Sequence, residues 1–437
     1  MSSQADSTAL LNANFGNISG VLANEDRSLY ANRGFQAVGT FATNNTVSTT
    51  PVGPTVTFGS EQRWNIRKQG GRVARMWIRL RIAAGTLAAG NAAAYVNYLG
   101  QTILEYVRVE YQSKSIQAYN GELEKAVNRL MFNDIDRELY NALILGNLPP
   151  GSAGETLRIN NVSAAVTLYI PLDWLWYCMY DDYALTPEAI AGELQLIIKW
   201  RQLENLIYAR TVPGGITPVV DPFTVRPVIT EALLFQQLIY ENKPAKVLNL
   251  QSFTQGQGQI FKIRDIEEQR NMLIPLAAGV YRVKLENLRL DSQYIAFFIR
   301  DTAMNTPWAV DRTSSDATAT LLAGGGAVNA IIPFTSFRMF VNGSLLIDVT
   351  TELEMRVLWR YLYMPTVNAG EGYYFIPFAR KLQDARNVTG FQNLANLGTV
   401  ELELTMGARP RDSWLDAYNI CHNIIQQLQG DILKIVR

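Results

Sequence analysis

The sequence contains one element twice, and this internal repeat restricts the chain to folds that are built from two similar parts. The first copy spans residues 104–132, and the second begins at Phe337, with matching positions 230 residues apart. In both copies apolar and polar residues alternate, which predicts a strand with one buried face. Apolar residues at helical spacing follow, so each strand is expected to lead into a short helix. The clearest identities pair Glu122, Leu123, Glu124 and Val127 with Glu352, Leu353, Glu354 and Val357.

Both predicted helices begin at equivalent cap positions, Gly121 and Thr351. Each is followed three residues later by a glutamate, and Thr351 with Glu354 has the pattern of a capping box. Acidic residues are favourable near the positive end of the helix dipole. We therefore interpret Glu122, Glu124 and their counterparts as helix-start charges and not as catalytic acids.

A second pair of landmarks recurs in the same order. Tyr169-Ile170-Pro171-Leu172 corresponds to Phe375-Ile376-Pro377-Phe378, and an alternating strand follows each of them, at residues 193–197 and 401–404. Because proline is confined to the starts and edges of strands, both prolines are expected at the same corner of the fold. Many short strands, with short helices only in loops, favour two β-sandwiches over an α/β architecture.

These patterns divide the chain into four segments. Residues 1–50, which are rich in small polar residues, are predicted to be an N-terminal arm that either orders against a partner or remains a disordered leader. Residues 51–240 and 241–408 are predicted to be the two β-domains. Residues 409–437 are predicted to be a C-terminal amphipathic helical tail. That tail would either pack on its own domain or contact a neighbouring subunit, a minor protein or an internal membrane surface.

Composition limits the classes of partner. Lys plus Arg and Asp plus Glu both number 39, so the formal net charge is zero and direct nucleic-acid binding is not expected. Charged residues make up only 18% of the chain, which suits large buried or inter-subunit surfaces. The N-terminus lacks the basic start and apolar core of a signal peptide, and no run reaches the roughly 20 apolar residues that span a bilayer.

The sequence predicts no catalytic, cofactor-binding or metal-binding residues. Cys178 and Cys421 are the only cysteines and are expected to be buried free thiols. The only histidine, His422, follows Cys421 in the predicted tail, where neighbouring residues face different sides of a helix and make a poor dyad or metal site. Five Asn-x-Ser/Thr sequons are weak evidence for glycosylation; they begin at Asn17, Asn44, Asn161, Asn342 and Asn387.

An aromatic stretch supports an alternative function. Trp174-Leu175-Trp176-Tyr177 precedes Asp181-Asp182, and tryptophans beside carboxylates occur in carbohydrate sites. Adjacent acids in a strand point to opposite faces, however, so a solvated loop is favoured for the two aspartates. A two-sandwich carbohydrate-active enzyme or sugar-binding protein therefore stays as the alternative interpretation.

Several stretches resemble motifs of one family in the same order. Residues 104–110 and the turn at 112–114 resemble a "strand, Gly-Gly-Gln, strand" element, although the glycines are missing. Residues 170–176 resemble a Pro-Leu-x-Phe-Trp-Phe corner, and residues 373–378 with 390–404 resemble the closing strands. The family is that of the double jelly-roll major capsid proteins of tailless double-stranded DNA viruses, in particular the nucleocytoplasmic large DNA viruses and their small relatives.

The resemblance covers residues 55–407 and implies an all-β fold of two tandem eight-stranded jelly rolls. It implies a structural protein and not an enzyme, placed in the virion capsid after assembly in a host cell. Three chains would form a pseudo-hexagonal homotrimer that tiles an icosahedral shell. The loop at 301–329 would form an outer tower or contacts between subunits. Expected partners are further copies of the chain, minor capsid or penton proteins, and an internal membrane surface that residues 409–437 would contact.

Overall fold

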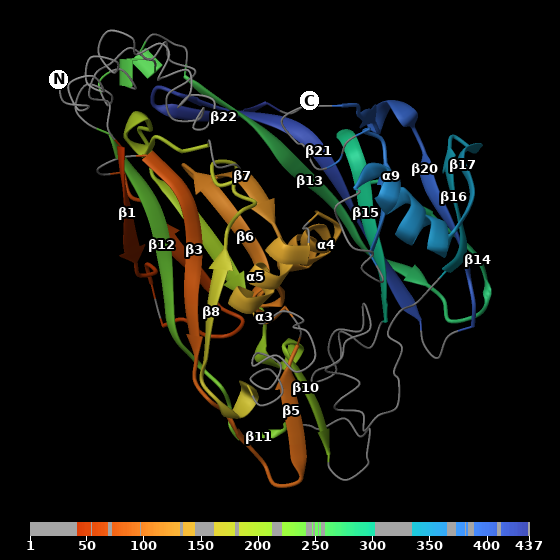
Figure 1. The fold of residues 1–437 in the computed structure, drawn as a ribbon, viewed down its shortest axis with the longest axis horizontal. Coiled ribbons are helices and arrows are strands. Elements are labelled where there is room, and N and C mark those ends of the chain that lie inside the picture. The colour runs from red at the N-terminus through yellow and green to blue at the C-terminus, as the bar shows by residue number, and fades with distance from the viewer. Residues whose placement is uncertain are drawn as a thin grey trace, which may run out of the picture.

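The chain folds into two lobes of antiparallel strands that lie side by side along its long axis (Figure 1). The computed structural model describes residues 42–435 except for 54, 69–71, 97, 132–133, 145–160, 180–182, 212–220, 242–246, 248–249, 252, 255–257, 302–333, 365–372, 381, 383–388 and 409–411. The arm before residue 42, the loop at 302–329, the Asp181-Asp182 pair and the sequons at Asn17 and Asn387 lie outside the described residues.

The first lobe is a sandwich of two four-stranded sheets. Its main strands are β1 (Ala42–Thr49), β2 (Glu61–Asn65), β3 (Arg72–Ile82), β6 (Leu104–Tyr111), β7 (Lys114–Tyr119), β8 (Val166–Pro171), β9 (Leu194–Trp200) and β12 (Ile229–Glu241). They are ordered β1-β12-β3-β8 in one sheet and β2-β9-β6-β7 in the other. Short strands β4 (Thr86–Leu87) and β11 (Phe223–Val225) form one ribbon, and β5 (Asn91–Tyr95) and β10 (Ile207–Thr211) form another.

The second lobe repeats this arrangement. Its main strands are β13 (Gln259–Ile274), β14 (Gly279–Lys284), β15 (Asp291–Asp301), β16 (Phe334–Val341), β17 (Ser344–Thr351), β18 (Tyr373–Pro377), β20 (Val400–Met406) and β21 (Ser413–Leu428). The sheets are ordered β13-β21-β15-β18 and β14-β20-β16-β17. The first of them also carries β19 (Gln392–Asn393) and β22 (Asp431–Ile435). The predicted fold of two tandem eight-stranded jelly rolls is confirmed.

Short helices occupy the connections, as predicted. In the first jelly roll they are α3 (Leu99–Thr102), α4 (Gly121–Met131) and α5 (Asp134–Ile144), with single turns η2 (Asn161–Ser163), η3 (Pro187–Ala189) and η4 (Leu203–Asn205). In the second, a helix over residues 352–363 contains a π-helical segment, η6 (Glu354–Leu358), and ends as α9 (Trp359–Tyr363). A further turn, η7 (Ala395–Leu397), precedes β20.

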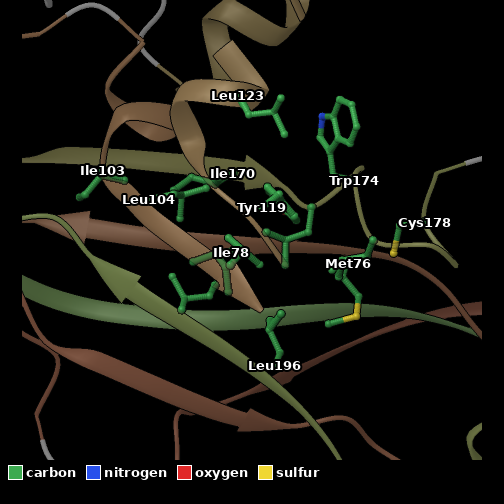
Figure 2. Packing of buried hydrophobic residues seen from close by; sticks show 14 of the residues in the cluster. Met76, Ile78, Ile103, Leu104, Tyr119, Leu123, Ile170, Trp174, Cys178 and Leu196 are labelled. Carbon is green, nitrogen blue, oxygen red and sulfur yellow. The ribbon is translucent and has the colours of Figure 1, made fainter. Parts of the chain in front are cut away.

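Strand β3 illustrates how sequence alternation positions a sheet face. Met76, Ile78 and Leu80 are buried in the core, whereas Trp77 and Arg79 lie on the opposite, half-buried face. Figure 2 shows Met76 and Ile78 packed among side chains from neighbouring strands, with Leu123 of α4 above them. The alternation of apolar and polar residues in the sequence therefore correctly predicts which side chains of β3 face the core.

The repeat is visible in the backbone of two hairpin turns. Gln112 and Ser113 join β6 to β7 with φ angles of 47° and 64°, and Asn342 and Gly343 join β16 to β17 with φ angles of 50° and 77°. These turns stand 230 residues apart, as the sequence repeat requires. Two consecutive positive φ angles define a type I′ turn, for which Asn-Gly is the favoured sequence. The first jelly roll therefore makes the same turn with two unfavourable residues.

Replacing Ser113 by glycine is expected to stabilise the first jelly roll. An L-residue in the left-handed region costs about 1–2 kcal/mol, and glycine removes this cost. Part of the gain is offset because glycine loses more conformational entropy on folding. We expect Ser113→Gly to raise the free energy of unfolding by about 0.5–1 kcal/mol, measured by urea denaturation. The matched control is Gly343→Ser, where nothing lies within 4 Å of an added Cβ, so its expected loss comes from backbone strain alone. A loss of stability in Ser113→Gly would contradict this explanation.

The two predicted helix caps had different outcomes. The capping box is confirmed, because the Thr351 N–H donates to Oε2 of Glu354 at 2.7 Å and the Glu354 N–H donates to Oγ1 of Thr351 at 3.2 Å. In the first copy the cap is Asn120, whose Oδ1 accepts from the Leu123 N–H at 2.8 Å. Gly121 serves close packing instead, since a Cβ there would lie 1.8 Å from the carbonyl oxygen of Gln101.

The predicted C-terminal helical tail is wrong, because residues 413–428 form the long strand β21 and β22 follows it. Strand β21 pairs with β13 on one side and β15 on the other, so it is a central strand of the second jelly roll. Both faces of this sheet are buried: Leu415 and Ala417 belong to the core of the second jelly roll, whereas Tyr418 and Ile420 belong to the other core. A strand that is buried on both faces does not alternate between apolar and polar residues, so its sequence can be mistaken for a helix.

The extent of the N-terminal arm is also wrong, because residues 42–49 form β1, which pairs with β12 along its whole length. Among the described residues, no helix combines the length and the apolar character that a membrane crossing needs.

The two prolines mark equivalent corners, as predicted. Pro171 ends β8 and Pro377 ends β18, and each strand lies at an edge of its sheet. Pro171 pairs with Trp77 of β3, and Pro377 pairs with Tyr294 of β15. These pairs align the two jelly rolls residue by residue.

Candidate assembly surfaces

The described residues contain no group of three or more His, Cys, Asp or Glu side chains that could hold a metal ion. Cys178 and Cys421 are buried free cysteines, as expected, and burial raises the pKa of both thiols well above the usual value. His422 lies on β21 and not on a helix, and its ring hydrogen-bonds with Gln293. Burial, with Arg264 and Lys262 nearby, lowers the pKa of His422 to about 4, so the ring is neutral near pH 7.

The aromatic stretch after Pro171 belongs to the core and is not a sugar-binding surface. Trp174 and Trp176 are 6% and 0% exposed, so neither ring offers a face to a glycan. Gln117 of β7 fixes this segment, because its Nε2 donates to the Trp174 carbonyl at 2.8 Å and its Oε1 accepts from the Trp176 N–H at 2.9 Å. The carbohydrate-binding alternative therefore loses the residues on which it depended.

Glu122 joins the two jelly rolls through a buried ion-pair cluster. Its carboxylate accepts from Arg201 of the first jelly roll at 2.8 Å and also contacts Arg270 of β13 in the second. Burial alone would raise the pKa of Glu122, but the two guanidinium groups outweigh it and hold the pKa well below its usual range. Asn120 adds a second link, since its amide donates to Glu268 of β13. The helix-start glutamate thus has a role that local sequence could not reveal.

Glu124, two residues later, is buried and has no ion-pair partner in the part of the chain that the structure describes. Burial raises the pKa of Glu124 to about 8, although the Tyr140 hydroxyl donates to its Oε1 at 2.5 Å. Its other oxygen has no hydrogen-bond partner among the described residues. The side chain is therefore largely protonated near pH 7, in contrast to exposed Glu354, its counterpart in the repeat.

The C-terminal turn, which we define as residues 428–431 between β21 and β22, binds the first jelly roll. The Gly430 carbonyl accepts from the Tyr111 hydroxyl at 2.5 Å, and the Gly430 N–H donates to the Ala189 carbonyl at 2.6 Å. Just before the turn, the Gln427 amide bonds the backbone of Thr186 twice, accepting from its N–H at 3.2 Å and donating to its carbonyl at 2.5 Å. The end of the chain therefore fastens the second jelly roll to the first.

Removing the Gln427 amide is expected to weaken this connection. The Gln427→Ala variant leaves the buried backbone groups of Thr186 without their partner, and each such loss costs about 1–3 kcal/mol. We expect a decrease of about 2–4 kcal/mol in the free energy of unfolding by urea denaturation. Gln426→Ala, at the neighbouring half-buried position, is the control and should change stability by less than about 1 kcal/mol. Equal effects of the two substitutions would contradict the assigned contact.

A single hydrophobic cluster spans both jelly rolls. Leu123 and Val127 of α4 belong to the same cluster as Tyr294 of β15 and Phe375 of β18, and α4 contacts both of these strands. Figure 1 shows α4 in the space between the two lobes, beside β15. The outer face of the sheet β13-β21-β15-β18 is therefore the surface on which the first jelly roll packs.

Among the residues that the structure describes, two apolar surfaces remain accessible to solvent. The open helix face comprises Leu353, Val357, Leu358, Tyr361 and Leu362 of the helix over residues 352–363, all of them exposed. The open sheet face lies on the outer side of β1-β12-β3-β8 and comprises Trp77, Tyr169, Leu233 and Phe235. Trp77 and Phe235 stack with ring centroids 5.6 Å apart, and Arg79 lies over the Phe235 ring at 5.1 Å. On the open sheet face Tyr169 is exposed and the other three side chains are half-buried. Contiguous accessible apolar surface of this kind marks protein interfaces.

Comparisons with known proteins agree with this architecture. Residues 31–220 match the protein-family model described as "Major capsid protein N-terminus". No curated protein sequence matches the chain. VP54 of PBCV-1, solved fitted into a reconstruction of the virophage Sputnik, is similar with a TM-score of 0.67 at 14% identity, over 91% of this chain and 97% of that chain.

Two further solved structures are similar over nearly the whole chain. The Faustovirus major capsid protein has a TM-score of 0.66 at 11% identity, over 96% of this chain and 99% of that chain. The Sputnik virophage structure gives a TM-score of 0.61 at 7% identity, over 92% of this chain and 90% of that chain. At such low identities the likeness establishes the shared fold alone. The family model covers less than half of the chain, so together these comparisons show a double jelly-roll fold that is similar to the fold of viral major capsid proteins.

Proposed function

We propose that three copies of the chain associate into a homotrimer with a pseudo-hexagonal outline, and that these trimers tile the facets of an icosahedral capsid. The observation that carries the proposal is the duplicated jelly roll, in which the same strand order occurs twice in tandem. Two similar lobes per chain and a threefold axis give six similar lobes around one centre. A six-lobed unit fills a hexagonal lattice, which is the lattice of a flat facet.

Further partners follow from the geometry of a closed shell. Six-lobed units fill sixfold positions, but a closed icosahedron also has fivefold vertices that such a unit does not fit. We therefore expect penton or minor capsid proteins to occupy these vertices and the edges between facets. With 39 basic and 39 acidic residues the chain has no net charge to attract a nucleic acid, so we expect no direct contact with the genome.

Electron microscopy of the purified protein tests the proposal. Negatively stained particles should show six lobes around a central axis, and under assembly conditions the same particles should form flat hexagonal arrays or closed shells. Isolated two-lobed particles under all conditions would contradict it. The buried Trp174 and Trp176 lead us to expect no binding of glycans in a parallel screen.

A further inference from the structure

The contact between the two jelly rolls within the chain has two sides. One side is the apolar face of α4, where Leu123 is 0% and Val127 is 2% exposed. The other side is the outer face of the sheet β13-β21-β15-β18, where Tyr294, Phe375 and Ile420 are fully buried. Glu122 and Arg270 flank this contact with an ion pair. Because the chain is duplicated, each side of this contact has an equivalent surface in the other jelly roll.

The equivalent of the α4 face is the open helix face. Leu353 and Val357 stand 230 residues after Leu123 and Val127, yet they are 59% and 44% exposed. Tyr361, farther along the same helix, is 72% exposed. The residues that fasten the first jelly roll to the second are thus repeated in the second jelly roll as exposed side chains.

The equivalent of the buried sheet face is the open sheet face. Trp77 pairs with Pro171 and with Phe235, just as Tyr294 pairs with Pro377 and with Ile420, so Trp77 is aligned with Tyr294 and Phe235 with Ile420. The same register aligns Tyr169 with Phe375, and Tyr169 is 41% exposed whereas Phe375 is buried. An aromatic sheet face that is covered in one jelly roll therefore stays open in the other.

The charges on both open faces are largely paired within each face, and the faces lie at different ends of the molecule. Arg75, Arg79 and Arg81 project on the sheet side, with Glu231 pairing the last two at 2.7 and 3.5 Å. The helix side begins with Glu352 and Glu354, and Glu352 pairs with Arg356 of the same helix at 2.9 Å. In Figure 1 the sheet that contains β1, β12 and β3 lies at one end of the molecule, and β14, β16, β17 and β20 lie at the other. The open sheet face therefore lies at one end of the molecule and the open helix face toward the other.

We propose that the open helix face of one copy docks on the open sheet face of the next copy, repeating between chains the contact that joins the two jelly rolls within a chain. A contact between two different surfaces is head-to-tail, and it closes into a ring when the rotation between neighbours fits. With two jelly rolls per chain, three chains make six equivalent contacts, of which three lie within chains and three between them. This inference rests on the proposed homotrimer and names the residues that would hold it together.

Charge substitutions at the open faces test the docking. A Leu353→Asp, Tyr361→Asp double variant and a Tyr169→Asp variant should each convert the trimer to monomers in light scattering, because each places carboxylates in an apolar contact. Val225→Asp is the control, since Val225 is 58% exposed on β11, outside both faces, and the trimer should persist. Circular dichroism and the melting temperature of the isolated monomers should match those of dissociated wild-type protein.

Cross-linking tests the head-to-tail pairing directly, and the buried native cysteines will not compete for the reagent. Tyr169→Cys and Tyr361→Cys single variants, each treated with a short bis-maleimide, should stay uncoupled. The double variant should give a covalent trimer, and a mixture of the two single variants should give covalent dimers. Coupling within a single variant, or trimers that persist in both Asp variants, would overturn the docking inference while leaving the trimer intact. A wild-type protein that never trimerises would instead overturn the proposed function.

Discussion

Replacing Glu122 by glutamine is expected to lower the free energy of unfolding by about 3 kcal/mol, because Arg201 and Arg270 then lose the carboxylate that neutralises them. The side chain of Glu122 is only 12% exposed, and those of the two arginines are 18% and 28% exposed, so water replaces little of the lost interaction. The effect should be seen in urea denaturation of the dissociated protein. It should also loosen the contact between the jelly rolls, which limited proteolysis of the connecting residues would detect.

The internal repeat supplies the control for this experiment. Glu352 is the counterpart of Glu122, but its one ion pair among the described residues is with Arg356, one helical turn away, at 2.9 Å, and it accepts from the Tyr374 hydroxyl at 3.1 Å. Glu352→Gln should therefore cost about 1 kcal/mol. The pKa of Glu122 lies below its usual range, so the wild-type advantage is present above about pH 4.5 and decreases as the pH falls below that value. Equal losses in the two variants would refute the bridging role of Glu122.

Replacing Glu124 by glutamine is expected to have the opposite sign. Burial raises the pKa of Glu124 to about 8, so the folded protein keeps a proton that the unfolded chain releases above its usual pKa of 4.5. The folded state then binds more protons than the unfolded state between these values, and wild-type stability falls as the pH rises from 4.5 to 8. Glu124→Gln removes this dependence and should be more stable than wild type at pH 8 by on the order of 3 kcal/mol.

Urea denaturation at pH 5 and pH 8 measures this difference, with Glu354→Gln as the matched control. Glu354 is exposed, and its hydrogen bonds with Thr351 lower its pKa, so it is ionised at both pH values. The control should therefore keep the pH dependence of wild type. A pH dependence between 5 and 8 that survives in Glu124→Gln would show that another group is responsible.

The fold could be predicted from the repeat because most of its strands show alternating apolar and polar residues in the sequence. Half-buried strands such as β3 and β6 alternate in sequence, and the hairpin positions 112–113 and 342–343 keep their spacing to the residue. The signal failed where both faces of a sheet are buried. Strand β21 reads as a nearly continuous run of apolar and amide residues, and these happen to recur at helical spacing.

The assembly surfaces could be predicted only in part. Residues 353–363 are apolar on several sides of the helix, which is the sequence signal of a helix that is covered on more than one face. This pattern does not show whether the residues that cover the helix belong to the same chain or to another copy. The open sheet face depends on which strands are neighbours, and the role of Glu122 depends on Arg270, which stands 148 positions away in the chain. Only the folded structure brings these residues together.

The native mass of the purified protein, measured by light scattering across a range of concentrations, tests the central claim most directly. Three chains of 48.9 kDa predict a particle of about 147 kDa, or larger shells built from it. A monomer of 48.9 kDa at every concentration would contradict the account, since a duplicated jelly roll that does not associate cannot supply six lobes around one axis.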